Sequence, residues 1–182
     1  YERGGSLVGS EMCIRDRGEI ADLFDTFLLD AFGVLNVGDT AIAGAAQRAQ
    51  MLKDMGKDVL VLTNGACFPA EQALKKFLSF GIPLEIADII SSRAALAAAI
   101  PPLPDSGFWG VMSTQNSHVE TLGIPWKRLE NDMSIYDAAS GFILLSTLEW
   151  TEAQQMLLQE SLAKVARPIL VGNPDIVAPR GR

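Results

Sequence analysis

The chain has 182 residues and a mass of 19.6 kDa, enough for one ordinary domain or two small ones with a buried core. Its 15 Lys and Arg against 22 Asp and Glu give a net charge of −7, and a surface of this sign disfavours a nucleic-acid binder. Two cysteines and one histidine are too few for a disulfide scaffold or a Cys/His zinc site. No apolar run reaches the ~18 residues of a membrane-spanning helix, and no secretory signal is recognisable, so we expect a cytoplasmic protein without membrane contact.

The first 17 residues lack helical and strand periodicity and combine glycines with scattered charges. Residues Ser10 to Arg17 resemble the translation of a sequencing-adapter read, which would make this tail foreign to the protein. A genuine flexible N-terminus is the alternative. Both interpretations predict disorder over residues 1–17.

Residues 18–103 alternate short apolar runs with helical patterns. Thr26 to Leu29 predicts a buried parallel strand that ends in Asp30, and the runs at 58–62 and 87–90 predict two more strands. Glycine-rich sequence over 33–44 predicts a connector. Helices are predicted over 45–55, 70–80 and 93–100. This βαβαβα order predicts an α/β fold with a parallel sheet and right-handed crossovers.

A stiff linker at Pro101-Pro-Leu-Pro104 predicts a domain boundary, with a second α/β unit over residues 104–182. Strands are predicted over 108–112, 141–145 and 168–171. Between the last two, Thr151 is the predicted N-cap of a helix running to about Ala166. We expect its side chains Met156, Leu158 and Leu162 to pack on the sheet.

Polar side chains follow the first two predicted strands, where each strand ends. Because the carboxyl ends of parallel strands share one edge of a sheet, we expect Asp30 and Thr63 to face one crevice. The commoner role of such an Asp is to form the turn after a strand. Cys67 falls just after the second strand, near this predicted site.

Four segments of the chain carry a family resemblance. They are Asp30-Ala-Phe-Gly-Val-Leu35, Val61-Leu-Thr-Asn64, Ile90-Ser-Ser92 and Gly172-Asn-Pro-Asp175. In this order and spacing they resemble the haloacid dehalogenase (HAD) superfamily, in its class IIA, NagD-like branch, over about residues 22–179. The resemblance implies a Rossmann-like HAD core over 18–103 and a C2-type cap over 104–182, both partial.

The resemblance also implies a Mg²⁺-dependent hydrolase of small phosphate monoesters. Asp30 would be the nucleophile and form an aspartyl-phosphate, and its other oxygen and the carbonyl of Phe32 would hold Mg²⁺. The Thr63 hydroxyl, with the following backbone amides of Asn64 and Gly65, would bind the phosphate, and the Asn64 side chain would orient either Asp30 or the phosphate.

Two residues of the fourth segment have two open interpretations. Asn173 and Asp175 would contact the substrate, or they would simply build the turn after the strand at 168–171. The expected partner is a small phosphorylated metabolite rather than a nucleic acid or a membrane. A homo-oligomer formed through the cap is left open.

The chain departs from the family pattern in two ways. Phe32 stands where the family has a second Asp that serves as general acid and then base, a role typically worth ~10²–10⁴-fold in rate. The family's third motif, a Lys, and its acidic fourth motif cannot be placed before Arg182, so we expect a truncated gene product with impaired or no turnover. The alternative is a non-catalytic HAD-like domain that binds a phosphorylated ligand or a protein. The retained Asp30 favours the enzyme.

Overall fold

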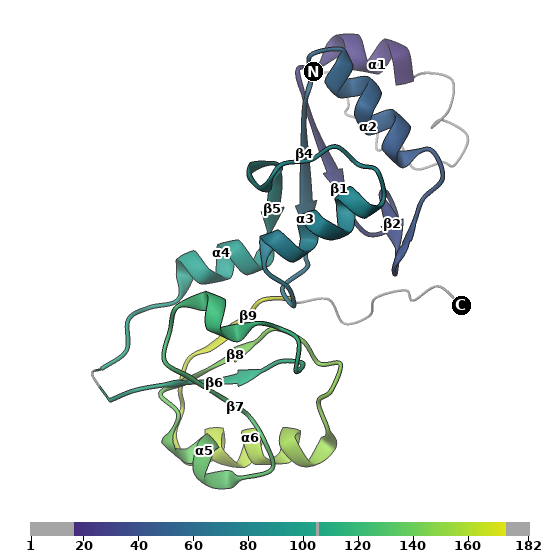
Figure 1. The fold of residues 1–182 in the computed structure, drawn as a ribbon. Helices are drawn as coiled ribbons and strands as arrows, with labels where there is room; N and C mark the ends of the chain where they lie inside the picture. The colour runs from purple at the N-terminus through teal and green to yellow at the C-terminus, as the bar shows by residue number, and fades with distance from the viewer. Residues whose placement is uncertain (1–16, 105, 174–182) are drawn as a thin grey trace, which may run out of the picture.

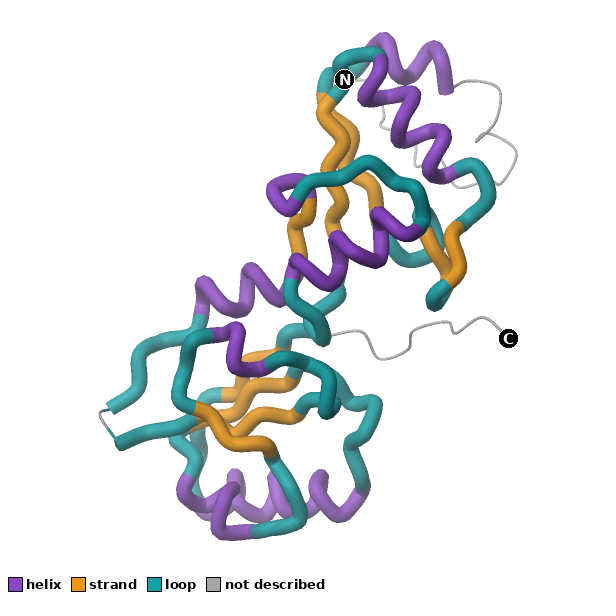
Figure 2. The backbone as a smooth tube through the Cα atoms, viewed as in Figure 1, coloured by secondary structure: helices purple, strands orange, loops and turns teal. Residues whose placement is uncertain are grey.

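The computed structural model describes residues 17–104 and 106–173, which form two parallel sheets in an α/β arrangement (Figures 1 and 2). Of the tail predicted over 1–17, only Arg17 is described, and a helix begins there; the rest lies outside the described residues. In chain order, the elements of the first unit are α1 (Arg17–Leu23), β1 (Thr26–Asp30), β2 (Asn36–Val37), β3 (Thr40–Ala41), α2 (Ala45–Asp54), β4 (Asp58–Thr63), α3 (Ala70–Ser79), η1 (Ile86–Asp88), β5 (Ile89–Ser91) and α4 (Ser92–Ala99).

The first sheet has the order β1-β4-β5, and all its strands are parallel, as the sequence predicts. One of its faces packs on helices, because Val59 and Val61 share a cluster with Ala49 of α2 and Phe77 of α3. No described element covers the other face, where Leu28 is 62% exposed and Leu62 and Ile90 are also exposed. The prediction of a fully buried first strand is therefore wrong, since an apolar run shows that one face is covered but not that both are.

The helices of this unit begin and end close to their predicted positions. Gly56 and Gly81 follow α2 and α3 with φ of 74° and 76°, a backbone conformation that favours glycine and ends a helix. The structure also contains elements that the sequence analysis missed. These are α1 and the short antiparallel hairpin of β2 and β3 inside the predicted connector.

The second unit consists of β6 (Trp109–Met112), η2 (Val119–Leu122), β7 (Trp126–Arg128), α5 (Met133–Ala138), β8 (Gly141–Leu144), α6 (Glu152–Lys164) and β9 (Ile169–Val171). Its sheet has the order β7-β6-β8-β9 with all strands parallel. Successive side chains of β6 alternate between two clusters: Met112 packs with Tyr136 of α5 and Leu158 of α6. Trp109 and Val111 pack on the opposite face.

That opposite face contacts the first unit. Ala66, from the loop after β4, and Leu96, from α4, belong to the same buried cluster as Trp109 and Val111. The predicted boundary at residue 104 thus lies between two units that share a hydrophobic cluster, to which the first unit contributes its loop after β4 and helix α4 and the second unit its sheet. Figure 1 shows α4 and the second sheet side by side at this junction.

Helix α6 begins as predicted, with Thr151 as N-cap and Gln154 completing a capping box. Leu158 is 4% exposed, which confirms its predicted packing on the sheet. Met156 is 68% exposed, so its predicted packing is wrong. Two residues along a helix correspond to a rotation of about 200°, so Met156 and Leu158 lie on opposite sides.

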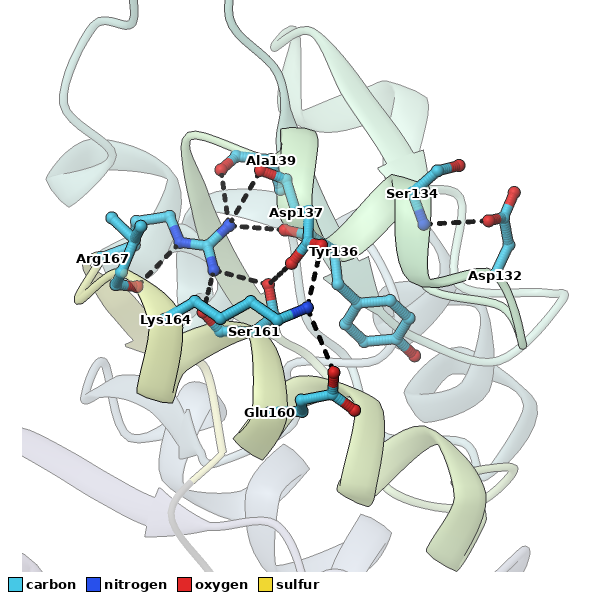
Figure 3. Close-up of polar contacts among 10 residues, drawn as sticks. Asp132, Ser134, Tyr136, Asp137, Ala139, Glu160, Ser161, Lys164 and Arg167 are labelled. Carbon is cyan, nitrogen blue, oxygen red and sulfur yellow. Dashed lines mark hydrogen bonds and ion pairs between the residues drawn. The ribbon is translucent and has the colours of Figure 1, made fainter.

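Arg167 joins the end of α6 to the end of α5 (Figure 3). Its guanidinium donates to the carbonyl oxygens of Tyr136, Ala139 and Ser161. All these acceptors lie within the second unit.

Within the described residues, no helix is both long and apolar enough to cross a membrane.

Candidate functional site

A cavity of about 370 Å³ lies at the carboxyl end of the first sheet. Its walls come from the loop after β1, the β2–β3 hairpin, the loop after β4, helix α3 and the end of β5. The lining residues are Ala31, Phe32, Asn36, Asp39, Thr63, Gly65, Cys67, Phe68, Ala70, Gln72, Ala73, Lys76, Phe77 and Ser91. This is the edge at which ligands of parallel α/β sheets bind.

Asp30 is the last residue of β1, and its partner in the register with β4 is Leu62. Its side chain is exposed, and Asp30 and Thr63 end neighbouring parallel strands, as expected. However, Asp30 is not among the residues that line the cavity. Ladder partners share a face of the sheet and successive residues alternate, so Asp30 projects to the face of Leu62, and Thr63 to the other. The two side chains therefore leave their strands on opposite faces, and a phosphoryl group that contacts both would lie across the carboxyl edge of the sheet.

Thr63 holds the turn that follows β4. The backbone N–H of Gly65 donates to the Thr63 Oγ1 atom over 3.1 Å. Because this bond occupies an oxygen lone pair, the hydroxyl proton is left to donate elsewhere. The Gly65 amide, expected to bind phosphate, is already used in this turn. Asn64 between them is exposed.

Phe32 places its half-buried side chain against the cavity. Its carbonyl oxygen accepts no hydrogen bond from the described residues, since the turn bonds here use the oxygens of Ala31 and Asn36. An exposed carboxylate at Asp30 and an unused carbonyl at Phe32 suit a hard cation such as Mg²⁺ as two of about six oxygen ligands. Among the described residues there is no cluster of three or more His, Cys, Asp or Glu that could supply a larger set.

The hairpin wall of the cavity is held by a lysine that the sequence analysis missed. Lys76 of α3 donates to the Gly38 carbonyl and to Asp39 Oδ1, each over 2.8 Å. The hydrogen bond and the charge of Lys76 hold the pKa of Asp39 below its usual value. Residues 37 positions apart make this contact, so no local pattern could have indicated it.

The fourth family segment is described only as far as Asn173, which is exposed. Asp175 lies outside the described residues. Gly172 places this segment against the loop after β4: a Cβ added to Gly172 would lie 2.9 Å from Cβ of Ala66. The end of β9 thus approaches the candidate phosphate loop, two residues beyond Asn64.

Comparisons with known proteins found a matching family model, related sequences and similar folds. Residues 27–123 match the family model described as haloacid dehalogenase-like hydrolase. Phosphoglycolate phosphatase 2 from Arabidopsis thaliana is 36% identical over 77 residues, covering 42% of this chain and 26% of that protein. The 4-nitrophenylphosphatase of Schizosaccharomyces pombe is 29% identical over 82 residues, covering 45% of this chain and 28% of that protein.

A solved structure shows the fold over most of the chain. The crystal structure of a hydrolase of the haloacid dehalogenase-like family from Brucella suis aligns with a TM-score of 0.71 and 22% identity, covering 90% of this chain and 61% of that one. The alignments with the two curated relatives cover about a quarter of those proteins' lengths.

Proposed function

The chain belongs to the haloacid dehalogenase-like hydrolase family, and from this we propose that it transfers the phosphoryl group of small phosphate monoesters to Asp30. The observation that carries the proposal is the placement of an exposed carboxylate at the end of β1, next to the strand that ends in Thr63. The names of the two relatives, a phosphoglycolate phosphatase and a 4-nitrophenylphosphatase, support a small monoester as substrate.

In the proposed reaction an Asp30 oxygen attacks the phosphorus atom. A bond forms between Asp30 and phosphorus, and the bond to the ester oxygen breaks, so the alcohol leaves with the bonding electrons. Water then hydrolyses the aspartyl-phosphate, which regenerates Asp30 and releases inorganic phosphate. The Thr63 hydroxyl, whose oxygen accepts from Gly65, has its proton available for a phosphoryl oxygen.

Mg²⁺ would be held by the Asp30 carboxylate and the Phe32 carbonyl, and when bound it would neutralise charge on the phosphoryl group. The side chain of Phe32 has no proton to give and no base to activate water. Both steps therefore lack general acid–base assistance from this position, which is typically worth ~10²–10⁴-fold. We expect activated esters to phosphorylate Asp30 and the second step to be slow.

The test is a burst experiment with 4-nitrophenyl phosphate and Mg²⁺. We expect release of up to one nitrophenolate per chain, followed by little turnover, and a phosphoryl group on Asp30 in the intact-mass and peptide spectra. Asp30→Asn should abolish both signals, and Asp22→Asn, an exposed acid outside the site, should leave them unchanged. No phosphorylation of the parent chain, or phosphorylation that persists in Asp30→Asn, would contradict the proposal.

A second candidate is a domain that binds a phosphorylated ligand without reacting with it. It is favoured by the cavity itself, which Phe32 and Phe68 line and Asp30 does not. In the same experiment this function gives saturable binding of the monoester, no burst and no covalent phosphate.

A further inference from the structure

Arg93, in α4, is a buried cation that joins the two units of the molecule. Arg93 is 4% exposed, and burial lowers the pKa of its guanidinium below the ordinary value. Nη1 donates to the carbonyl oxygens of Ala66, over 2.9 Å, and Cys67, over 3.2 Å. Nη2 donates to the carbonyl of His118, over 2.8 Å, and to Thr121 Oγ1, over 3.0 Å. Two acceptors thus belong to the loop after β4 and two to the region of η2.

All four acceptors are neutral oxygens, and no described carboxylate lies within ion-pair distance of Arg93. A buried charge without a counter-ion costs free energy unless its hydrogen bonds are fully made. The backbone of His118, whose carbonyl Arg93 binds, carries a separate conformational cost, because His118 is the one described non-glycine residue with positive φ, at 45°. An apolar side chain in place of Arg93 would avoid the desolvation cost, so the guanidinium is best explained by the segments that it holds together.

A second contact joins the same two regions. Cys67 Sγ lies 3.4 Å from Thr114 Oγ1 and 3.3 Å from Ser117 Oγ. Those hydroxyls are 2.7 Å apart, and Ser117 is completely buried. The side chain of Cys67 is therefore seated on the second unit while its carbonyl is bound by Arg93.

The fixed carbonyls determine where the next amides point. In a trans peptide the C=O and the following N–H are antiparallel, and the described residues contain no cis peptide. With the oxygens of Ala66 and Cys67 on Arg93, the N–H groups of Cys67 and Phe68 point away from it. Neither amide donates a hydrogen bond within the described residues, and both residues line the cavity that Thr63 lines.

We propose that Arg93 is a positioning residue that fastens the loop after β4 to the second unit and thereby presents the Cys67 and Phe68 amides to the phosphate group of the substrate. The phosphate part rests on the proposed function; the fastening part does not. Backbone amides that have no acceptor within the protein are suitable donors for an anion.

The fastening is measured by the reactivity of the Cys67 thiol. In a Cys13→Ser background Cys67 is the remaining thiol, and its reaction with Ellman's reagent reports how often the loop leaves the second unit. Arg93→Met removes all four hydrogen bonds and should raise the rate by about tenfold or more. Arg93→Lys, with fewer donors in a different geometry, should give an intermediate rate.

The matched control is Arg167→Met, which also removes an arginine that binds several carbonyls, all of them inside the second unit (Figure 3). It should leave the Cys67 rate within about twofold of the parent, because the loop after β4 is untouched. Should Arg93→Met fail to fold, Thr121→Val tests the same bond from the acceptor side and should raise the rate by a few-fold. Unchanged rates in the folded Arg93 and Thr121 variants would overturn the proposal.

Binding of inorganic phosphate in the presence of Mg²⁺ tests the second part, with titration calorimetry as the readout. Arg93→Met should weaken the parent's affinity by about tenfold, and Arg167→Met should not change it. Equal affinity in Arg93→Met and the parent would overturn the role of the amides. Absence of phosphate binding by the parent would overturn the proposed function as well, while the thiol rates would still decide whether Arg93 fastens the loop.

Discussion

Tyr136 illustrates how a single buried atom sets a local free-energy cost. The residue is 0% exposed, and no described group bonds to its hydroxyl. Burial raises the pKa of Tyr136 to about 12. A buried hydroxyl without a partner retains a desolvation penalty of about 1–3 kcal/mol. The packing of the aromatic ring offsets this penalty.

The corresponding prediction concerns Tyr136→Phe. At neutral pH we expect the free energy of unfolding, measured by urea denaturation, to stay the same or to rise by up to about 1–3 kcal/mol. The pKa is higher in the folded state, so the neutral phenol stabilises the fold below pH 10 and this contribution is lost as the pH rises from 10 towards about 12. The parent should lose more stability than the variant in that window.

A variant Tyr136→Phe that is destabilised at neutral pH by more than about 1 kcal/mol would show that the hydroxyl has a partner that stabilises the fold.

At the scale of elements, α6 offers a matched pair of apolar residues on opposite sides of one helix. Leu158→Ala should lower the free energy of unfolding by about 2–5 kcal/mol, because it leaves a cavity beside Met112 and Tyr136. Met156→Ala should change it by less than about 0.5 kcal/mol, since Met156 is exposed and Ala favours helix. Urea denaturation of both variants checks this; similar losses in the two would mean that Met156 is buried in solution.

The sequence predicted those elements whose signals are local. Glycines after α2 and α3 and the capping box of α6 each lie within a few residues of the helix end that they define. Strand β7 and helix α5, with 3 and 6 residues, were missed, because polar residues interrupt both, whereas the equally short β5 and β9 lie in apolar runs. The open face of the first sheet could not be predicted either, because coverage of a face depends on residues distant in sequence.

The candidate site likewise has parts that local sequence predicts and parts that it does not. The sequence predicted that Asp30 and Thr63 end neighbouring strands, because the carboxyl ends of parallel strands lie at the same edge of a sheet. The pairing of Lys76 with Asp39 and that of Arg93 with Cys67 join residues 37 and 26 positions apart. Such contacts depend on how the elements pack, so these parts of the site required the structure.

At the scale of the whole molecule, the close approach of Gly172 to Ala66 tests how the two units fit. The change Gly172→Ala would place a Cβ 2.9 Å from that of Ala66 and 3.3 Å from the carbonyl oxygen of Leu144. We expect a loss of about 1–3 kcal/mol in the free energy of unfolding from overpacking. Adding Ala66→Gly should recover part of this loss, and a double-mutant cycle measures the coupling. Strictly additive effects would mean that the two residues do not touch in solution.

The open face of the first sheet also has a calorimetric consequence. Side chains such as Leu28 and Leu62 are already hydrated in the native state, so unfolding adds little new contact between them and water. The heat-capacity increment of unfolding scales mainly with newly hydrated apolar area. Per residue, we therefore expect the first unit to contribute less to this increment than the second, whose central strands β6 and β8 are buried on both faces. We therefore expect the stability curve of the whole chain to be flatter with temperature than that of a chain of equal length with both sheets covered, and its enthalpy of unfolding to change less between cold and warm conditions.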